Sequence, residues 1–282
     1  MLTIQQLKVK YQNFTALQIE QSITIQPYDR IGVIGANGAG KTTLIKACLG
    51  LVPYEGSIQC VIKPEQMAVH MQHNGYVDTM SVKHIMETIL QTSYQKNEQL
   101  QELVRFFQFE ASLRKKYKQL SGGQKQRFTL ILVLMQDAPI TFFDEVTTGL
   151  DFETRQALMG KIISWYQNKE VAMLFVTHYY EELEQLTNKL LILDQGKVVA
   201  FGERDELFRQ YCGHSVVIFQ AGYEQLCEGY RVLLAPSNAI AVACANKQEE
   251  QEIISRLLDA GINFKRSDHD IEILTMNAIG GN

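Results

Sequence analysis

The chain has 282 residues, 46% of them hydrophobic, which is enough for one large packed domain or for a large domain with a small one. Its formal net charge of −4 argues against a general nucleic-acid binder and against electrostatic adhesion to an anionic membrane. A signal-peptide pattern, an apolar run of bilayer length and a C-x-x-C pair are not found in the sequence. We therefore expect a cytoplasmic protein with reduced thiols, without a disulfide framework or a cysteine metal site.

The N-terminal residues alternate between apolar and polar types in two segments. One contains Ile4, Leu7 and Val9, and the other runs from Leu17 to Ile25. This alternation predicts antiparallel strands. A further apolar run, residues 31–34, predicts a buried strand that leads directly into a glycine-rich segment.

Residues 35–42 read GANGAGKT and fit the pattern G-x-x-x-x-G-K-[ST] of a phosphate-binding loop. The glycines allow a turn whose backbone N–H groups converge on phosphate oxygens at the start of a helix predicted for Thr42–Leu49. Lys41 can bring a positive charge to the β- and γ-phosphates, and Thr42 can offer its hydroxyl to Mg²⁺. A glycine turn with a solvated lysine is the alternative, but the order strand, turn, helix favours phosphate binding. The expected ATP-binding residues of this segment are Gly35, Asn37, Gly38, Ala39, Gly40, Lys41, Thr42 and Thr43.

After this helix, the pattern predicts short strands between residues 57 and 71, and then a helical stretch from Ser81 to Met135 with one break near Ser121. Ser121 stands where a helix N-cap belongs, and Gly122 and Gly123 let backbone N–H groups approach a ligand closely. The pattern predicts a second anion-binding helix start. Capping alone would also explain a simple helix with a flexible first turn.

Two carboxylates follow the apolar run Ile140–Phe143, which predicts a strand. Beside a phosphate loop, Asp144 suits Mg²⁺ binding, and Glu145 could orient and deprotonate a water that attacks the γ-phosphate. Without that loop, solvent-facing acids at a strand end would be an equally good interpretation. His178 follows the predicted strand Met173–Val176, at the sheet edge that faces a ligand crevice, where it could hydrogen-bond a γ-phosphate.

The predicted strands alternate with helical stretches around residues 155–167 and 180–187, which indicates a parallel α/β sheet. Helices inserted before this part predict a helical subdomain of about residues 76–136. We expect a first domain of residues 1–212 and a second, small α+β domain of residues 213–282.

The expected second domain has the order β-α-β-β-α-β, which is typical of a ferredoxin-like module. Its predicted elements are the strands Val216–Phe219, Val232–Leu234, Ile240–Ala243 and Ile271–Leu274, and the helix Glu249–Leu258.

Taken together, the motifs resemble the ATPase subunit of an ATP-binding-cassette (ABC) transporter over about residues 1–210. GANGAGKTT resembles the Walker A segment of this family, ITFFDE its Walker B segment, and LSGGQKQR its signature, which other phosphate-loop ATPases lack. The resemblance implies a P-loop NTPase fold, with a RecA-like parallel sheet core, N-terminal antiparallel strands and a helical subdomain.

Several residues take their expected roles from this resemblance. Tyr11 matches the aromatic residue that stacks on adenine, and Gln72 matches the Q-loop glutamine at the Mg²⁺ site. Asp151 matches the D-loop and His178 the switch histidine. The sequence departs from the family at Val146, where proline usually follows the Asp-Glu pair.

The resemblance also implies that two identical or related subunits enclose two ATP molecules with Mg²⁺. The signature of one subunit, Ser121, Gly122, Gly123 and Gln124, would close over the γ-phosphate held by the other. Hydrolysis would reopen the dimer and drive a transmembrane permease, expected as a separate polypeptide docked near Gln72 at the inner face of the cell membrane. The short helical subdomain and small C-terminal module resemble exporter ATPases, so we expect export and no nucleic-acid partner.

Two other functions stay open. One is a soluble ABC-type ATPase that acts on ribosomes or DNA, although such relatives usually carry two cassettes or a long coiled-coil insertion, and neither is visible. The other is a non-catalytic nucleotide-binding regulator, against which Glu145 and His178 argue.

Overall fold

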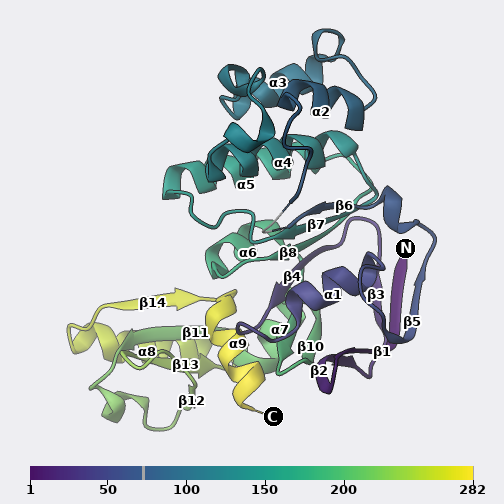
Figure 1. Cartoon of the computed structure of the whole chain (residues 1–282). Helices are drawn as coiled ribbons and strands as arrows, with labels where there is room; N and C mark the ends of the chain where they lie inside the picture. The colour runs from purple at the N-terminus through teal and green to yellow at the C-terminus, as the bar shows by residue number, and fades with distance from the viewer. Residues whose placement is uncertain (72–73, 282) are drawn as a thin grey trace.

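The computed structural model describes residues 1–71 and 74–281, and its larger sheet has ten strands. These strands are β1 (Leu2–Tyr11), β2 (Phe14–Ile19), β3 (Ile23–Ile25), β4 (Arg30–Ile34), β5 (Glu55–Cys60), β6 (Ala68–His70), β7 (Ile140–Asp144), β8 (Ala172–Val176), β9 (Lys189–Asp194) and β10 (Lys197–Glu203). Their order across the sheet is β3-β1-β2-β10-β9-β4-β8-β7-β6, with β5 paired to β1 (Figure 1). The sheet therefore joins an antiparallel N-terminal part to a parallel core.

The core strands β6, β7, β8, β4 and β9 are mutually parallel, as the alternation of strands and helices predicts. Asp144 at the end of β7 aligns with Val176 at the end of β8, so the loops that follow these strands leave the sheet at one edge. Successive residues point to opposite faces. Phe142 accordingly packs with the N-terminal strands and the helix after the phosphate loop, while Phe143 packs with helices on the other face.

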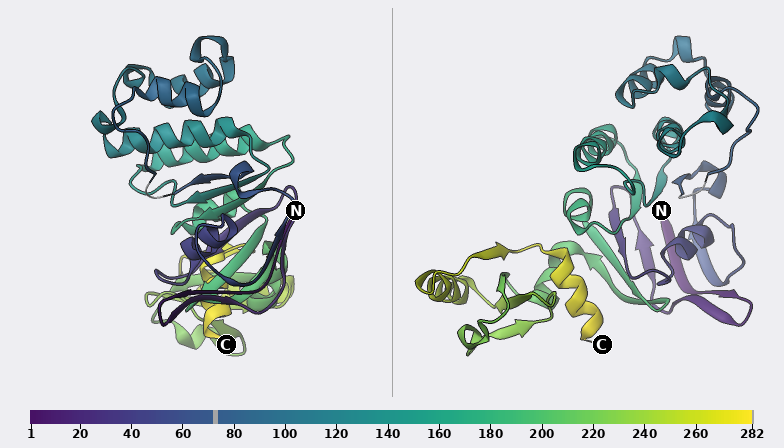
Figure 2. Two further views of the ribbon diagram at one scale, coloured as in Figure 1. Left: turned by 45° about the vertical axis from the view of Figure 1, so that its right-hand side comes forward. Right: turned by 60° about the vertical axis from the view of Figure 1, so that its left-hand side comes forward.

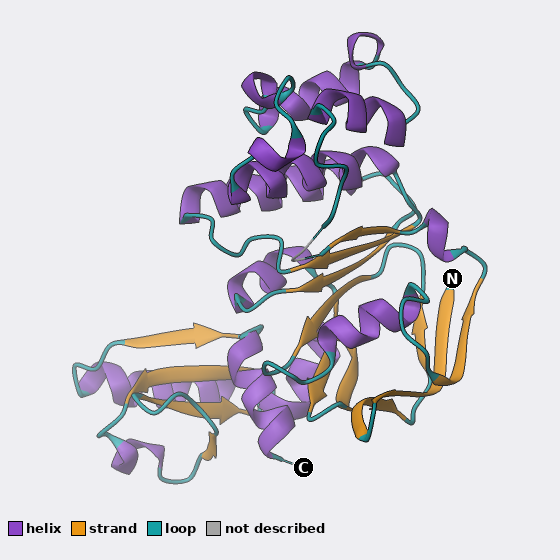
Figure 3. Ribbon diagram, viewed as in Figure 1, coloured by secondary structure: helices purple, strands orange, loops and turns teal. Residues whose placement is uncertain are grey.

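Helices cover both faces of the parallel core. The helices of this part are α1 (Lys41–Cys48), α2 (Val82–Ile89), α3 (Glu98–Phe106), α4 (Gly122–Gln136), α5 (Phe152–Tyr166), α6 (Tyr180–Leu186) and α7 (Arg204–Cys212), and of these α2 and α3 pack on α4. The helices α2 to α5 gather at one end of the molecule, beyond β6 and β7 (Figure 3). Across the described residues, we find no helix with the length and apolar character needed to cross a bilayer.

The expectation of a helical stretch with one break near Ser121 is wrong. Helix α2 ends at Ile89 and α3 at Phe106, and two short 3-10 turns lie between α3 and α4, at Glu110–Ser112 and Tyr117–Gln119. Periodicity alone could not show these breaks, because apolar residues of the intervening turns, such as Leu113, also face the core.

The N-terminal expectation needs a smaller correction. The segment Leu17–Ile25 forms two strands rather than one, because residues 20–22 turn the chain between β2 and β3. Both β2 and β3 pair antiparallel with β1, as the alternation predicts. The strand β10 was not expected; it pairs antiparallel with β9 and joins the two parts of the sheet.

The C-terminal residues form a second, antiparallel sheet in the order β12-β13-β11-β14. Its elements are β11 (Ser215–Gln220), β12 (Arg231–Leu233), β13 (Ala239–Cys244), α8 (Lys247–Asp259), β14 (Phe264–Ser267) and α9 (Ile271–Gly280). The α+β character is as expected, but a four-residue 3-10 turn, Glu224–Cys227, replaces the first helix of the β-α-β-β-α-β order.

The predicted strand Ile271–Leu274 is wrong, because these residues begin helix α9. The Asp270 carboxylate caps α9 by accepting the Ile273 backbone N–H, and the last strand is β14. Helix α8 covers one face of the C-terminal sheet. Helix α9 lies against α6, α7 and β10, between that sheet and the rest of the chain (Figure 2). The C-terminal unit is thus packed onto the larger part through α9.

Candidate active site

The phosphate loop connects β4 to α1 and needs glycine at two positions. A Cβ added to Gly35 would lie 2.3 Å from the backbone oxygen of Leu193. Gly40 caps α1 with φ +101°, in the left-handed region, and a Cβ there would lie 2.9 Å from the oxygen of Ala16. The backbones of β9 and β2 therefore lie so close to the loop that only glycine fits at these two positions.

Lys41 lies buried inside this loop. Its ammonium donates hydrogen bonds to the backbone oxygens of Gly35 at 2.6 Å and Ala36 at 3.0 Å. Burial lowers the pKa of Lys41, while the carboxylates of Glu145 and Asp144 oppose that shift. The chain thus holds a cationic group within the curve of the phosphate loop, where an anionic phosphate would stabilise it.

Asp144 and Thr42 form a pair of oxygen donors beside the loop. The Thr42 hydroxyl donates to Oδ2 of Asp144 at 2.9 Å, whereas Oδ1 is buried and has no hydrogen-bond partner in the part of the chain that the structure describes. Asp144 is 1% exposed, and burial raises its pKa against the opposing hydrogen bond from Thr42. An unpaired buried carboxylate oxygen beside a hydroxyl fits the hard oxygen ligands that Mg²⁺ prefers. Among the residues that the structure describes, no group of three or more His, Cys, Asp or Glu side chains could hold a metal ion.

Glu145 and His178 meet at the same sheet edge. Glu145 has φ +52°, in the left-handed region, and its N–H donates to the Val176 oxygen at 2.8 Å. His178 follows β8 as expected, and its Nε2 lies 3.0 Å from Oε1 of Glu145. The contact joins the carboxylate that could activate water to the ring that could touch a γ-phosphate.

The predicted helix start at Ser121 is confirmed. The Ser121 hydroxyl accepts the Gln124 N–H at 3.3 Å, and the Gln124 side chain accepts the Ser121 N–H at 3.1 Å. Gly122 and Gly123 are exposed, and an added Cβ at either would have no atom within 4 Å. Within the described residues, no hydrogen bond links 121–124 to the phosphate loop of the same chain. This helix start is open to a ligand or to another molecule.

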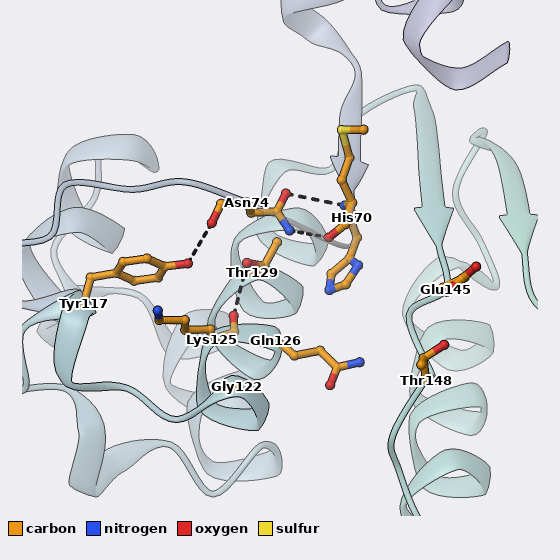
Figure 4. A pocket seen from close by; sticks show the side chains of 10 residues that line it. His70, Asn74, Tyr117, Gly122, Lys125, Gln126, Thr129, Glu145 and Thr148 are labelled. Carbon is orange, nitrogen blue, oxygen red and sulfur yellow. Dashed lines mark hydrogen bonds between the residues drawn. The ribbon is translucent and has the colours of Figure 1, made fainter. Parts of the chain in front are cut away.

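A cavity of about 520 Å³ separates the start of α4 from Glu145 (Figure 4). Gln126 reaches across and donates to the Val146 oxygen at 2.5 Å. His70, at the end of β6, is 3% exposed, and neither ring nitrogen has a hydrogen-bond partner among the described residues. Burial lowers the pKa of His70 to about 4, so the ring is neutral at neutral pH.

Three further residues take their expected roles from family resemblance. Tyr11 is 43% exposed at the end of β1, opposite Phe14 in a hairpin. Asp151 caps α5 by accepting both the N–H and the hydroxyl of Thr154, and these bonds lower its pKa. Gln72 lies outside the described residues.

Sequence reasoning missed Glu182, a buried carboxylate on α6. It accepts hydrogen bonds from the hydroxyls of Thr147 at 2.9 Å and Thr177 at 2.7 Å. A signal was present, because Glu182 lies four residues before Leu186 and beside Leu183, on the apolar side of the helix. A carboxylate at such a position requires buried partners.

A sequence model described as ABC transporter matches residues 20–148. The chain is 30% identical over 209 residues to the Nod factor export ATP-binding protein I of Cupriavidus metallidurans, covering 69% of each chain. It is 30% identical over 217 residues to the tungstate uptake system ATP-binding protein TupC of Peptoclostridium acidaminophilum, covering 73% of this chain and 99% of TupC. A solved structure of the ATP binding subunit of an ABC transporter matches with a TM-score of 0.67 and 22% identity, over 75% of this chain and 93% of that chain.

Proposed function

Because this chain belongs to the ABC transporter family as an ATP-binding protein, it is an ATPase, and we propose that two copies close around ATP and drive export by a separate transmembrane permease. The observation that carries this proposal is the meeting of Thr42, Asp144, Glu145 and His178 at one sheet edge, beside Lys41. These residues supply the charge, the metal ligands and the base that phosphoryl transfer to water requires.

In this proposal, Lys41 and the loop N–H groups bind the β- and γ-phosphates. Thr42, Asp144 and Gln72 would hold Mg²⁺, which would neutralise charge on the phosphate oxygens. Glu145 takes a proton from the attacking water, and His178 orients the Glu145 carboxylate through their 3.0 Å contact. Tyr11 stacks on the adenine ring.

In a dimer, the exposed helix start at Ser121 would have a ligand, the ATP bound by the other copy. The chain has two helix starts suited to phosphate, one at Gly40 and one at Ser121, and no hydrogen bond among the described residues joins them. In an antiparallel pair of subunits, Ser121, Gly122, Gly123 and Gln124 of one copy would contact the γ-phosphate bound by the other, with Asp151 near the interface. ATP would then bridge the copies, and hydrolysis would release them.

An apolar hollow supports permease docking on the helical part. Gly75, Tyr76, Val77, Met80 and Ile89 line a cavity of about 430 Å³ just after Gln72, and Val77 and Ile89 are exposed. Exposed apolar side chains in a hollow are typical of protein-binding sites. We place the subunit at the inner face of the cell membrane through this contact.

Export and the domain division belong to the same proposal. We assign residues 1–212 to a nucleotide-binding domain, with a helical subdomain of about 76–136, and 213–282 to an accessory domain. Nearly the whole of TupC corresponds to 73% of this chain, so the rest of the chain is an addition to the part shared with TupC, which supports the proposed division. The names of the relatives include both export and uptake, so direction is tested by transport into or out of vesicles that hold the subunit and its permease.

Dimerisation is tested with Glu145→Gln, which we expect to bind ATP but to hydrolyse it about 100-fold more slowly or worse. Size-exclusion chromatography with light scattering should show an ATP-dependent dimer of this variant. Adding Ser121→Arg should abolish the dimer without weakening ATP binding, because the arginine would occupy the partner's phosphate contact. A monomer with full ATPase activity would contradict the shared site.

A further inference from the structure

The carboxylate of Glu182 joins two catalytic loops that are far apart in sequence. Glu182 is 2% exposed, and its Oε2 accepts both threonine hydroxyls. Thr147 lies two residues after Glu145, and Thr177 lies one residue before His178. One buried atom therefore anchors both loops.

Arg155 contacts the loop of His178 on the C-terminal side of the histidine. Its guanidinium lies 4.0 Å from the ring centroid of Tyr179, which follows His178. The same side chain lies 3.7 Å from Oε1 of Glu182, and both partners are largely buried. Both neighbours of His178 in the sequence therefore contact the same ion pair. Thr177 is hydrogen-bonded to Glu182, and Tyr179 lies against Arg155.

The local backbone explains why an anchor is needed. Glu145 has φ +52°, and conformations of this kind persist only where the surroundings impose them. The backbone bond from Glu145 to Val176 fixes one side of the residue, and the bond from Thr147 to Glu182 fixes the other. Burial raises the pKa of Glu182, while both threonine bonds and Arg155 favour its charged form. The contacts with Thr147, Thr177 and Arg155 therefore offset the cost of removing the Glu182 carboxylate from water.

We propose that Glu182 is a positioning residue for ATP hydrolysis, which holds the loop of Glu145 and the loop of His178 in register so that their side chains meet. This inference rests on the proposed roles of Glu145 and His178. Glu182 would not touch the nucleotide. Its effect would therefore fall on turnover rather than on ATP binding.

The test compares steady-state kinetics of Glu182→Ala and Glu182→Gln with the parent chain. We expect Glu182→Ala to lower kcat about 100-fold, because small displacements of catalytic groups have effects of this size, with KM for ATP unchanged. The glutamine should recover most of the activity, because its amide oxygen can accept from both threonine hydroxyls as Oε2 does. The matched control is Glu181→Ala, an exposed neighbour on the same helix, which should keep full turnover.

Two milder variants serve if Glu182→Ala fails to fold. Thr147→Val and Thr177→Val remove one hydroxyl each at constant shape, and both should lower kcat with KM unchanged. Parent-like kcat in both variants would overturn the proposal, as would a folded Glu182→Ala with normal turnover. A loss of kcat that glutamine does not recover would do the same, since it would indicate damage to the fold.

A background variant separates this inference from the function on which it rests. If Glu145→Gln alone leaves turnover unchanged, the assigned role of Glu145 is wrong. If Glu145→Gln lowers turnover as expected, adding Glu182→Ala should cause little further loss, because both act on one step. If the fold-decrease in kcat of the double variant equals the product of the two single fold-decreases, Glu182 does not act through Glu145.

Discussion

Replacement of His178 by alanine removes the ring that contacts Glu145, and the structure sets the size of the expected effect. A hydrogen bond to a charged group contributes about 1.5–3 kcal/mol. The contact is 3.0 Å long, but the His178 side chain is 45% exposed, so water screens it and the lower value applies. A barrier higher by about 1.5 kcal/mol slows turnover about tenfold.

The measurement is phosphate release at saturating ATP, together with the Kd of a fluorescent ATP analogue. We expect kcat of His178→Ala to fall about tenfold or more, since loss of a γ-phosphate contact would add to the loss of the Glu145 contact. The Kd should change little, because Lys41 and the loop N–H groups bind the triphosphate. His178→Gln should be less impaired, because its amide can still donate to Glu145.

The matched control is His84→Ala, which removes an exposed histidine on α2 and should leave turnover of the isolated protein unchanged. Turnover of His178→Ala equal to the parent would refute the assigned contact. A parallel loss of ATP affinity would also refute it, because His178 would then be a binding residue rather than one that acts on hydrolysis.

Three further outcomes follow from the site and the core. Asp144→Asn should lose ATPase activity yet raise the Tm at neutral pH. Burial raises the pKa of Asp144, so the charged carboxylate opposes folding and the neutral amide does not. The difference in Tm between the variant and the parent should shrink as the pH falls towards 4 in calorimetric scans, because the parent carboxylate is then protonated. Gly40→Ala should weaken ATP binding measurably in titrations, because it forces a side chain into φ +101° at a strain of about 1–3 kcal/mol. Leu274→Ala, in the buried face of α9, should lower the free energy of unfolding by about 2–5 kcal/mol in urea titrations.

Much of the site could be predicted from the sequence, because its parts are local. The phosphate loop, the Ser121 cap and the strand before Asp144 each depend on a few adjacent residues whose types restrict the backbone. Glu182 could not be found in this way, since its partners Thr147 and Thr177 come from other loops and meet it only through the fold.

The errors in the fold have the same origin. The run Ile271–Leu274 is apolar except at Glu272, and a run of only four residues does not distinguish a buried strand from a buried helix. Its helical state depends on the Asp270 cap and on surfaces from both sheets. The unpredicted strand β10 is likewise specified by its neighbours, β9 and β2, rather than by a strong alternation of its own.

Helix α9 joins the two sheets through one apolar core. Its side chains Ile271 and Leu274 belong to the same apolar core as Leu183 of α6 and Leu207 of α7, and Asn277 is hydrogen-bonded to the backbone of Leu234 beside the C-terminal sheet. Heat should therefore unfold the chain in one cooperative transition instead of releasing the C-terminal unit first. A chain cut after Gly213 would expose apolar side chains of α6 and α7 that α9 covers. We expect such a truncated protein to aggregate rather than to fold into a smaller enzyme.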